Sequence, residues 1–114
     1  MSQMIQRGRE IIRINAQRNY IEYSTDGGRS WHSRYTSSFC GTFVDLLDYG
    51  RDILACTSKG LYYSSDDGRS WHSRYTSSFC GTFLQLMSDG SQILATTSKG
   101  LYYSTDAGRS WHRK

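Results

Sequence analysis

One eight-residue pattern, Ser-x-Asp-x-Gly-x-x-Trp, occurs three times in this chain of 114 residues. The three copies begin at Ser24, Ser64 and Ser104, and their tryptophans are 40 residues apart. Each copy follows a short aromatic and aliphatic stretch that is typical of a strand. The pattern predicts a β-hairpin, because the Asp side chain accepts hydrogen bonds from turn amides and Gly adopts a positive φ. We expect the Trp to begin the returning strand and to fold back over the turn.

The residues expected to build these turns have a structural role in our interpretation, and none of them is assigned to catalysis. They are Ser24, Asp26, Gly28 and Trp31 in the first copy, Ser64, Asp66, Gly68 and Trp71 in the second, and Ser104, Asp106, Gly108 and Trp111 in the third. The octad resembles the Asp-box, or BNR repeat, found on the blades of β-propellers such as sialidases, sortilins and photosystem assembly factors. The resemblance implies an all-β fold.

The repeat divides the chain into three units, each with four short strands separated by turn signals. A period of about 40 residues with four strands is typical of a propeller blade. We expect a divergent first blade at residues 1–38, a second at 39–78 and a third at 79–114. The predicted strands are 4–7, 10–15, 20–24 and 30–35, then 42–47, 52–57, 61–64 and 70–75, with the same pattern repeated in the third unit. Residues 31–70 and 71–110 are identical at 30 of 40 positions.

Three blades are too few to close a propeller, which typically has 4–8 blades. A blade buries both faces of its sheet against its neighbours, so three blades in a row leave two apolar end faces uncovered. Such a surface is normally an association surface. We therefore expect a homodimer that closes as a six-bladed ring. A different closed ring, or a longer parent chain of which this is a piece, is the alternative.

Charge and cysteine content restrict the classes of partner and location. The formal charge is +4, and the basic residues are spread along the chain, which argues against a nucleic-acid partner. No apolar run approaches the roughly 20 residues that span a membrane. Residues 1–10 lack the apolar core of a signal peptide. The three cysteines, an odd number, are expected to be free thiols, which favours the cytoplasm.

Histidines and turn aspartates could in principle hold a metal, but the repeat argues against it. His32, His72 and His112 each follow a Trp and fall on the outermost strand of separate blades, too far apart to share an ion. Alternation along the strand points them outward. The turns lack the alternating acidic spacing of a calcium loop. We expect no metal and no cofactor.

A sialidase-like hydrolase is the third function considered, and the residues do not support it. The resemblance implies a need for three arginines, a nucleophilic Tyr paired with Glu, and an acidic Asp. The chain has only two glutamates, Glu10 and Glu22, and its Arg13-Ile14-Asn15 lacks the Pro of the family's Arg-Ile-Pro signature. We therefore predict a protein without enzymatic activity.

Repeated loops provide the candidate binding surface. In a four-stranded blade, the links between blades share one side of the disc with the turns between the second and third strands, opposite the Asp-box turns. The mixture of side chains there favours hydrogen bonding to, and stacking on, a sugar ring, with repeated weak sites gaining by avidity. A protein-interaction or assembly scaffold is the alternative. The candidate ligand-binding residues are Arg34, Tyr35, Ser58, Lys59, Arg74, Tyr75, Ser98 and Lys99.

Overall fold

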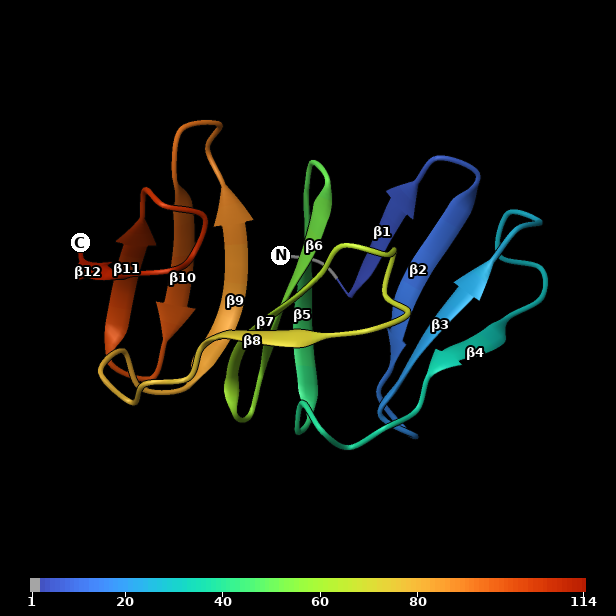
Figure 1. Ribbon diagram of the computed structural model, residues 1–114, viewed down its shortest axis with the longest axis horizontal. Helices are drawn as coiled ribbons and strands as arrows, with labels where there is room; N and C mark the ends of the chain where they lie inside the picture. The colour runs from blue at the N-terminus through green and yellow to red at the C-terminus, as the bar shows by residue number, and fades with distance from the viewer. Residues whose placement is uncertain (1–2) are drawn as a thin grey trace.

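The computed structural model describes residues 3–114, which form twelve β-strands in three four-stranded antiparallel sheets (Figure 1). The predicted all-β class and the three four-stranded units are confirmed. Each sheet lies within one of the three predicted ranges, whose boundaries stay a prediction. The first sheet contains β1 (Met4–Arg7), β2 (Glu10–Asn15), β3 (Tyr20–Ser24) and β4 (His32–Tyr35). The second contains β5 (Phe43–Tyr49), β6 (Asp52–Thr57), β7 (Gly60–Ser64) and β8 (His72–Tyr75). The third contains β9 (Phe83–Ser88), β10 (Ile93–Thr97), β11 (Gly100–Ser104) and β12 (His112–Arg113).

The fourth strand of each sheet starts later than predicted. The expected starts were Ser30 and Ser70, with the Trp as part of the strand, but β4 and β8 begin at His32 and His72. The reason lies in the turn, because the amide of Ser70 donates to the Asp66 carboxylate instead of to a neighbouring strand. The Trp therefore precedes the returning strand and does not begin it.

The first strand of the second sheet is longer than predicted, since β5 continues beyond Leu47 to Tyr49. Tyr49 pairs with Asp52, which leaves a tight two-residue turn at Gly50 and Arg51. Gly50 has a φ of 67°, a conformation that glycine adopts readily. The predicted turn at Asp48–Gly50 was thus placed too early.

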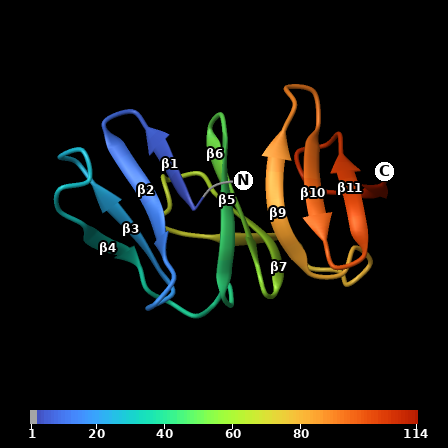
Figure 2. The same ribbon diagram turned by 180° about the vertical axis from the view of Figure 1, so that it is seen from behind.

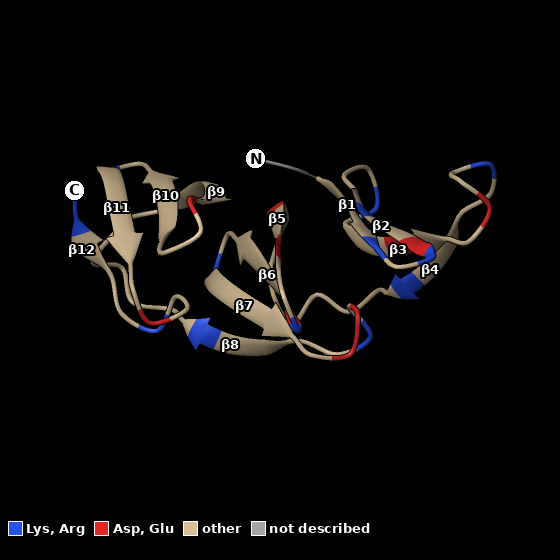
Figure 3. Ribbon diagram, turned by 90° about the horizontal axis from the view of Figure 1, so that it is seen from above, with Lys and Arg blue, Asp and Glu red and all other residues tan. Residues whose placement is uncertain are grey.

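The three sheets fan out from their first strands. Seen from above, β1, β5 and β9 lie toward the inside of an arc, and β4, β8 and β12 lie at its outer rim (Figure 3). The inner strands are in front when the molecule is seen from behind (Figure 2). Strand β5 contacts both β1 and β9, so the neighbouring sheets meet most closely on the inside of the arc.

Two apolar cores hold the arc together, one in each space between neighbouring sheets. The first core joins Ile12 and Ile21 of the first sheet to Phe43, Ile53 and Trp71. The second core joins residues of the second and third sheets, among them Leu54, Leu61, Phe83, Ile93 and Trp111. Successive residues of a strand point to opposite faces, so Ile53 and Leu54 enter different cores. The second sheet is consequently buried on both faces.

Candidate functional site

The Asp-box turns are closed by the same side-chain hydrogen bonds in all three sheets. In the second sheet, the Ser64 hydroxyl donates to Asp66 Oδ1 at 2.7 Å and accepts from the Gly68 amide at 2.8 Å. The amide and hydroxyl of Ser70 both donate to the Asp66 carboxylate, at 2.8 and 2.6 Å. Equivalent bonds connect Ser24, Asp26, Gly28 and Ser30, and also Ser104, Asp106, Gly108 and Ser110.

The tryptophan of each turn folds back as predicted. The indole N–H of Trp71 donates to the Gly68 carbonyl at 3.0 Å, and Trp31 and Trp111 do the same to Gly28 and Gly108. Trp71 and Trp111 are 4% exposed, whereas Trp31 is only half-buried. The turns therefore have the structural geometry that the sequence predicts.

The turn carboxylates are fixed as anions. Burial of Asp66 acts to raise its pKa, but the hydrogen bonds from Ser70 and Ser64 outweigh it and lower the pKa to about 2. The Ser110 hydroxyl and amide likewise lower the pKa of Asp106 to about 2. A group held ionised in this way cannot act as a general acid near neutral pH.

The histidines after the tryptophans lie on the surface, as predicted. His32, His72 and His112 are exposed, and each ring lies 5.4 Å from the ring of a tyrosine in the neighbouring strand. Within residues 3–114, no three His, Cys, Asp or Glu side chains gather closely enough to hold a metal ion. The same residues include no helix of a length and hydropathy that could span a membrane.

Two of the predicted ligand-binding residues, Arg34 and Arg74, lie between sheets and away from the link loops. Their side chains are 5% and 6% exposed. The Arg34 guanidinium donates to both carboxylate oxygens of Glu10 at 2.7 and 2.8 Å, and to the Asp67 carbonyl in the next Asp-box turn at 3.1 Å. It also lies 3.9 Å from the centre of the Tyr23 ring. Arg34 thus clamps the first sheet to the second.

Arg74 repeats this clamp between the second and third sheets. It donates to the Ala107 carbonyl at 3.0 Å, lies 4.0 Å from the centre of the Tyr63 ring and approaches Asp52 at 3.8 Å. Hydrogen bonds from Arg34 lower the pKa of Glu10, which keeps that carboxylate charged. Sequence reasoning missed both clamps, although Glu10 and Asp52 at the start of their strands were a signal for them.

The links and the second-to-third turns of the second and third sheets form one surface, which we call the link face. It consists of residues 36–42, 58–59, 76–82 and 98–99 and lies along the lower edge of Figure 1. A groove of about 310 Å³ on this face contains three of the predicted residues, Ser58, Lys59 and Lys99. Hydroxyl groups of Thr76, Ser77, Ser78 and Thr82 belong to the remaining lining.

The other predicted residues of this face have supporting positions. Ser98 accepts a hydrogen bond from the Thr82 amide at 2.9 Å and so fixes the link beside the groove. Tyr35 and Tyr75 are half-buried, and their rings pack edge-on against Phe43 and Phe83. These three residues do not line the groove.

Two phenylalanines complete the link face, and the sequence analysis did not single them out. Phe39 and Phe79 are each 55% exposed, and one edge of each ring packs on a buried tyrosine, Tyr62 or Tyr102. The Lys59 ammonium lies 3.4 Å from the Phe39 carbonyl. Phe39 and Phe79 occupy the same loop position in successive repeats, 40 residues apart, and this recurrence was the signal that could have identified them.

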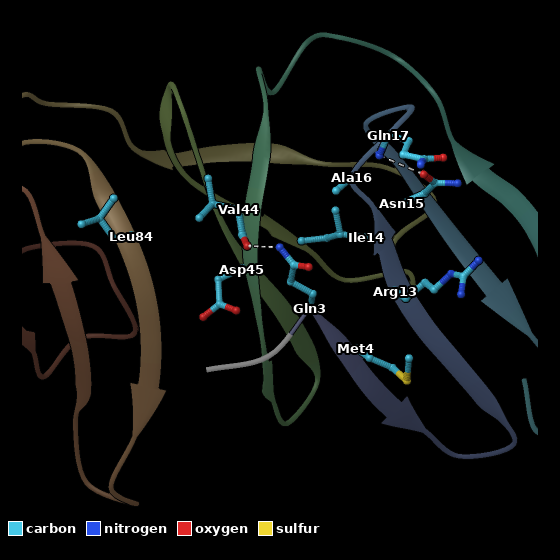
Figure 4. Close-up of a pocket in the computed structure, with 10 residues that line it drawn as sticks. All are labelled: Gln3, Met4, Arg13, Ile14, Asn15, Ala16, Gln17, Val44, Asp45 and Leu84. Carbon is cyan, nitrogen blue, oxygen red and sulfur yellow. Dashed lines mark hydrogen bonds between the residues drawn. The ribbon is translucent and has the colours of Figure 1, made fainter.

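A larger cavity of about 900 Å³ lies on the inside of the arc (Figure 4). Met4, Ile14, Val44 and Leu84 give it apolar walls. Its polar side chains hold strands together: Gln3 donates to the Val44 carbonyl at 3.1 Å, and Asp45 accepts from the Leu86 amide at 3.0 Å. We call this the axial cavity. Sequence reasoning did not predict it.

These sheets and turns define a protein built from β-propeller blades with Asp-box turns. The family model described as BNR/Asp-box repeat matches residues 22–33 and 102–113, so the first and third turns are similar to repeats of this family. The middle turn, at residues 64–71, has the same hydrogen bonds. No curated protein matches the sequence.

Solved structures of propellers share this fold. A structure titled "YCF48 bound to D1 peptide" is 16% identical, with a TM-score of 0.70 over 91% of this chain and 36% of that one. YCF48 from Cyanidioschyzon merolae is 21% identical, with a TM-score of 0.66 over 93% of this chain and 40% of its own. The chain thus spans less than half the length of either protein. A GH74 enzyme from Niastella koreensis has a TM-score of 0.43, too low to support a conclusion.

Proposed function

We propose that this chain is a non-enzymatic binding scaffold, which acts as a homodimeric six-bladed ring and holds an acidic, partly apolar protein segment on its link face. The observation that carries the proposal is the repeated pairing of a half-exposed phenylalanine with a lysine. Phe39 lies beside Lys59, and Phe79 lies in the link that Lys99 contacts. Exposed aromatic rings next to cations suit a segment that offers apolar side chains and carboxylates.

The groove between the two lysines has a size and lining that suit part of such a segment. Its volume of about 310 Å³ lies at the lower end of the range for ligand pockets. Two lysines line it, together with serines and threonines whose hydroxyl groups hydrogen-bond backbone amides and carbonyls equally well. A propeller of the same fold is described as bound to a peptide, which supports this class of partner.

Both glutamates of the chain are committed to arginines, which supports the proposal of a non-enzymatic protein. Glu10 is held by Arg34, and Glu22 accepts hydrogen bonds from Arg13 and Asn15 at 3.0 Å. A glycoside hydrolase of the kind considered from the sequence needs a carboxyl group that can gain and lose a proton. The lowered pKa of Glu10 opposes that role.

Carbohydrate binding is the second candidate, favoured by the hydroxyl-rich lining of the same groove. Ser58, Thr76, Ser77 and Ser78 offer donors and acceptors to sugar hydroxyls. The two lysines would select sugars with carboxylates. Arg34 and Arg74, which the sequence suggested as ligand-binding residues, are buried in the joints between sheets and so are not part of the proposed sugar site.

Fluorescence anisotropy tests the leading proposal with a short labelled peptide in which Glu and Leu alternate. We expect binding that weakens with salt, and no binding of the same peptide with Lys in place of Glu. Phe79→Ala and the double variant Lys59→Gln, Lys99→Gln should each weaken binding about tenfold. Leu84→Ala is the matched control, since Leu84 is 49% exposed but lines the axial cavity.

The outcomes separate the candidates. Loss of binding in Leu84→Ala with retention in Phe79→Ala would move the site to the axial cavity and refute the link-face proposal. Binding of sialylated or uronate-containing oligosaccharides in calorimetry, without peptide binding, would favour the second candidate. A folded protein that binds neither class would contradict both.

A further inference from the structure

Within residues 3–114, the first and third sheets each have one face that no neighbouring sheet covers. Leu101 in β11 is 40% exposed, whereas Leu61, the equivalent residue 40 positions earlier, is 0% exposed. Met4 in β1 is 50% exposed, whereas Leu46, its equivalent in β5, is 1% exposed. Side chains that are core residues in the second sheet are therefore surface residues at the two ends of the arc.

The joint between neighbouring sheets is built twice within the chain by the same contacts. An arginine of one sheet donates to a carbonyl in the next Asp-box turn, from Arg34 to Asp67 and from Arg74 to Ala107. Beside it, an aliphatic residue packs on the glycine of that turn: a Cβ on Gly68 would lie 3.3 Å from Ile21 Cγ2, and one on Gly108 would lie 2.6 Å from Leu61 Cδ2.

The uncovered faces carry the two halves of this joint. On the third sheet, Leu101 and Lys114 occupy the positions of Leu61 and Arg74. The Lys114 ammonium lies 5.3 Å from the centre of the Tyr103 ring, as Arg74 lies over Tyr63. The first sheet offers the other half, at Gly27 and Gly28 of its Asp-box turn.

The shape of the molecule fixes how many sheets the full circle would hold. Its extents are 40 × 28 × 19 Å, and the shortest lies along the radial direction of the arc (Figure 3). A disc cut in half across its diameter has a depth equal to half of that diameter. The depth of this molecule, 19 Å, is close to half of its 40 Å width. Three sheets thus fill about half a turn, and one further copy of the chain would fill the other half.

We propose that this second copy joins head to tail, with the uncovered face of the third sheet of each copy against the uncovered face of the first sheet of the other. Leu101 packs on Gly28 of the second copy, and Lys114 donates to its Gly27 carbonyl. Met4 of each copy becomes buried in the same joint. A two-fold axis relates the two joints, so neither face is left over. The inference names the surfaces of the homodimer in the proposed function, and it rests on that proposal.

The new joint is more polar than the internal ones. Arg13 stands where the second sheet has Ala55, and Glu22 stands where it has Tyr62. The Arg13 guanidinium lies 3.8 Å from the centre of the Trp31 ring and pairs with Glu22 at 2.9 Å. Two charged side chains therefore lie at the proposed joint, while each copy keeps its own two apolar cores.

Light scattering during size-exclusion chromatography tests the joint on the full chain. The protein should have about twice the mass of one 13.1 kDa chain. Met4→Glu and Leu101→Glu each place a charge on one end face, and both should yield single chains. Because the two side chains are exposed in one copy, neither change should unfold it, which circular dichroism checks. Phe79→Glu, 55% exposed but on the link face, should keep the doubled mass.

A mixture of the two end-face variants gives the sharpest result. Head-to-tail joining leaves one intact joint between a Met4→Glu copy and a Leu101→Glu copy, so equal mixing should restore the doubled mass. A joint between two third sheets predicts that Met4→Glu alone has no effect, and that result would overturn the proposal. A native chain that stays single, or forms larger rings, would also overturn it.

The same variants separate this inference from the proposed function. Phe79→Glu should keep the doubled mass and lose the Glu-Leu peptide. If the native chain binds the peptide but remains single, the joint is refuted while the link-face proposal stands. If it forms the dimer but binds no peptide, the joint stands and the ligand assignment fails.

Discussion

Removing one Asp-box tryptophan tests whether these turns hold the fold together. Trp71 is 4% exposed and lies in the core between the first and second sheets. Its ring centre is 5.5 Å from that of Phe43 and 6.5 Å from that of Tyr35. Trp71→Ala would remove these contacts and the indole hydrogen bond to Gly68.

The expected loss of stability in Trp71→Ala follows from the burial of the tryptophan side chain. Truncation of a buried tryptophan to alanine lowers the free energy of unfolding by about 3–5 kcal/mol. The two tilted or edge-on aromatic contacts place Trp71 in the upper part of that range, because such pairs add about 0.5–1.5 kcal/mol each beyond burial. For a domain of this size, the melting temperature should fall by about 12–20 °C.

His72→Ala is the matched control, since it changes the adjacent residue. The His72 side chain is exposed, and its ring lies 5.4 Å from the ring of Tyr63. We expect a loss of about 0.5 kcal/mol or less. Urea unfolding of both variants, followed by fluorescence and circular dichroism, gives the two free energies. Equal losses, or a loss below about 1 kcal/mol for Trp71→Ala, would refute the assignment of inward and outward faces.

Two further predictions concern ionisable groups. The pKa values of Asp66 and Asp106 are both lowered to about 2, so their charged forms stabilise the fold above the unfolded pKa of about 3.9, and this stabilisation is lost as the pH falls through about 2. Thermal melts from pH 5 to pH 2 should therefore show a falling melting temperature. Asp66→Asn should make the dependence of the melting temperature on pH shallower. Burial raises the pKa of Cys56 to about 12, and the Cys40 and Cys80 thiols are also fully buried. A thiol reagent at pH 8 should therefore label no cysteine of the native protein and all three cysteines in denaturant. Rapid labelling of the native protein would contradict the packing of both cores.

The turns and the second and third strands of the first sheet were predictable because their signals are local. Ser64, Asp66 and Gly68 are close in sequence, and their hydrogen bonds stay within one octad. The strands at 10–15 and 20–24 have turn signals at both ends and agree with β2 and β3 residue for residue. The start of β8 was misplaced because the Asp66 carboxylate competes with the neighbouring strand for the Ser70 amide.

The candidate site was less predictable because it depends on contacts across sheets. Arg34 was expected on the link face from its place near a loop, yet its partners Glu10 and Asp67 lie 24 and 33 residues away. Phe39 was not expected at all, because its 55% exposure depends on how the link crosses Tyr62. A single sequence shows which residues recur, but it does not show which neighbours they meet.

The placement of the arginines also narrows what the link face can recognise. Arg34 and Arg74 are the residues best suited to bidentate binding of a carboxylate, and both are occupied between sheets. The cations that line the groove on the link face are Lys59 and Lys99, which act as point charges on flexible stems. In the proposed complex, the lysines would therefore accept carboxylates in many orientations, and the phenylalanine rings would orient the bound segment. Such a face suits the proposed extended segment with several acidic residues better than one ligand held in a single orientation, because the phenylalanine and lysine cluster occurs twice on it, at Phe39 with Lys59 and in the link of Phe79 with Lys99.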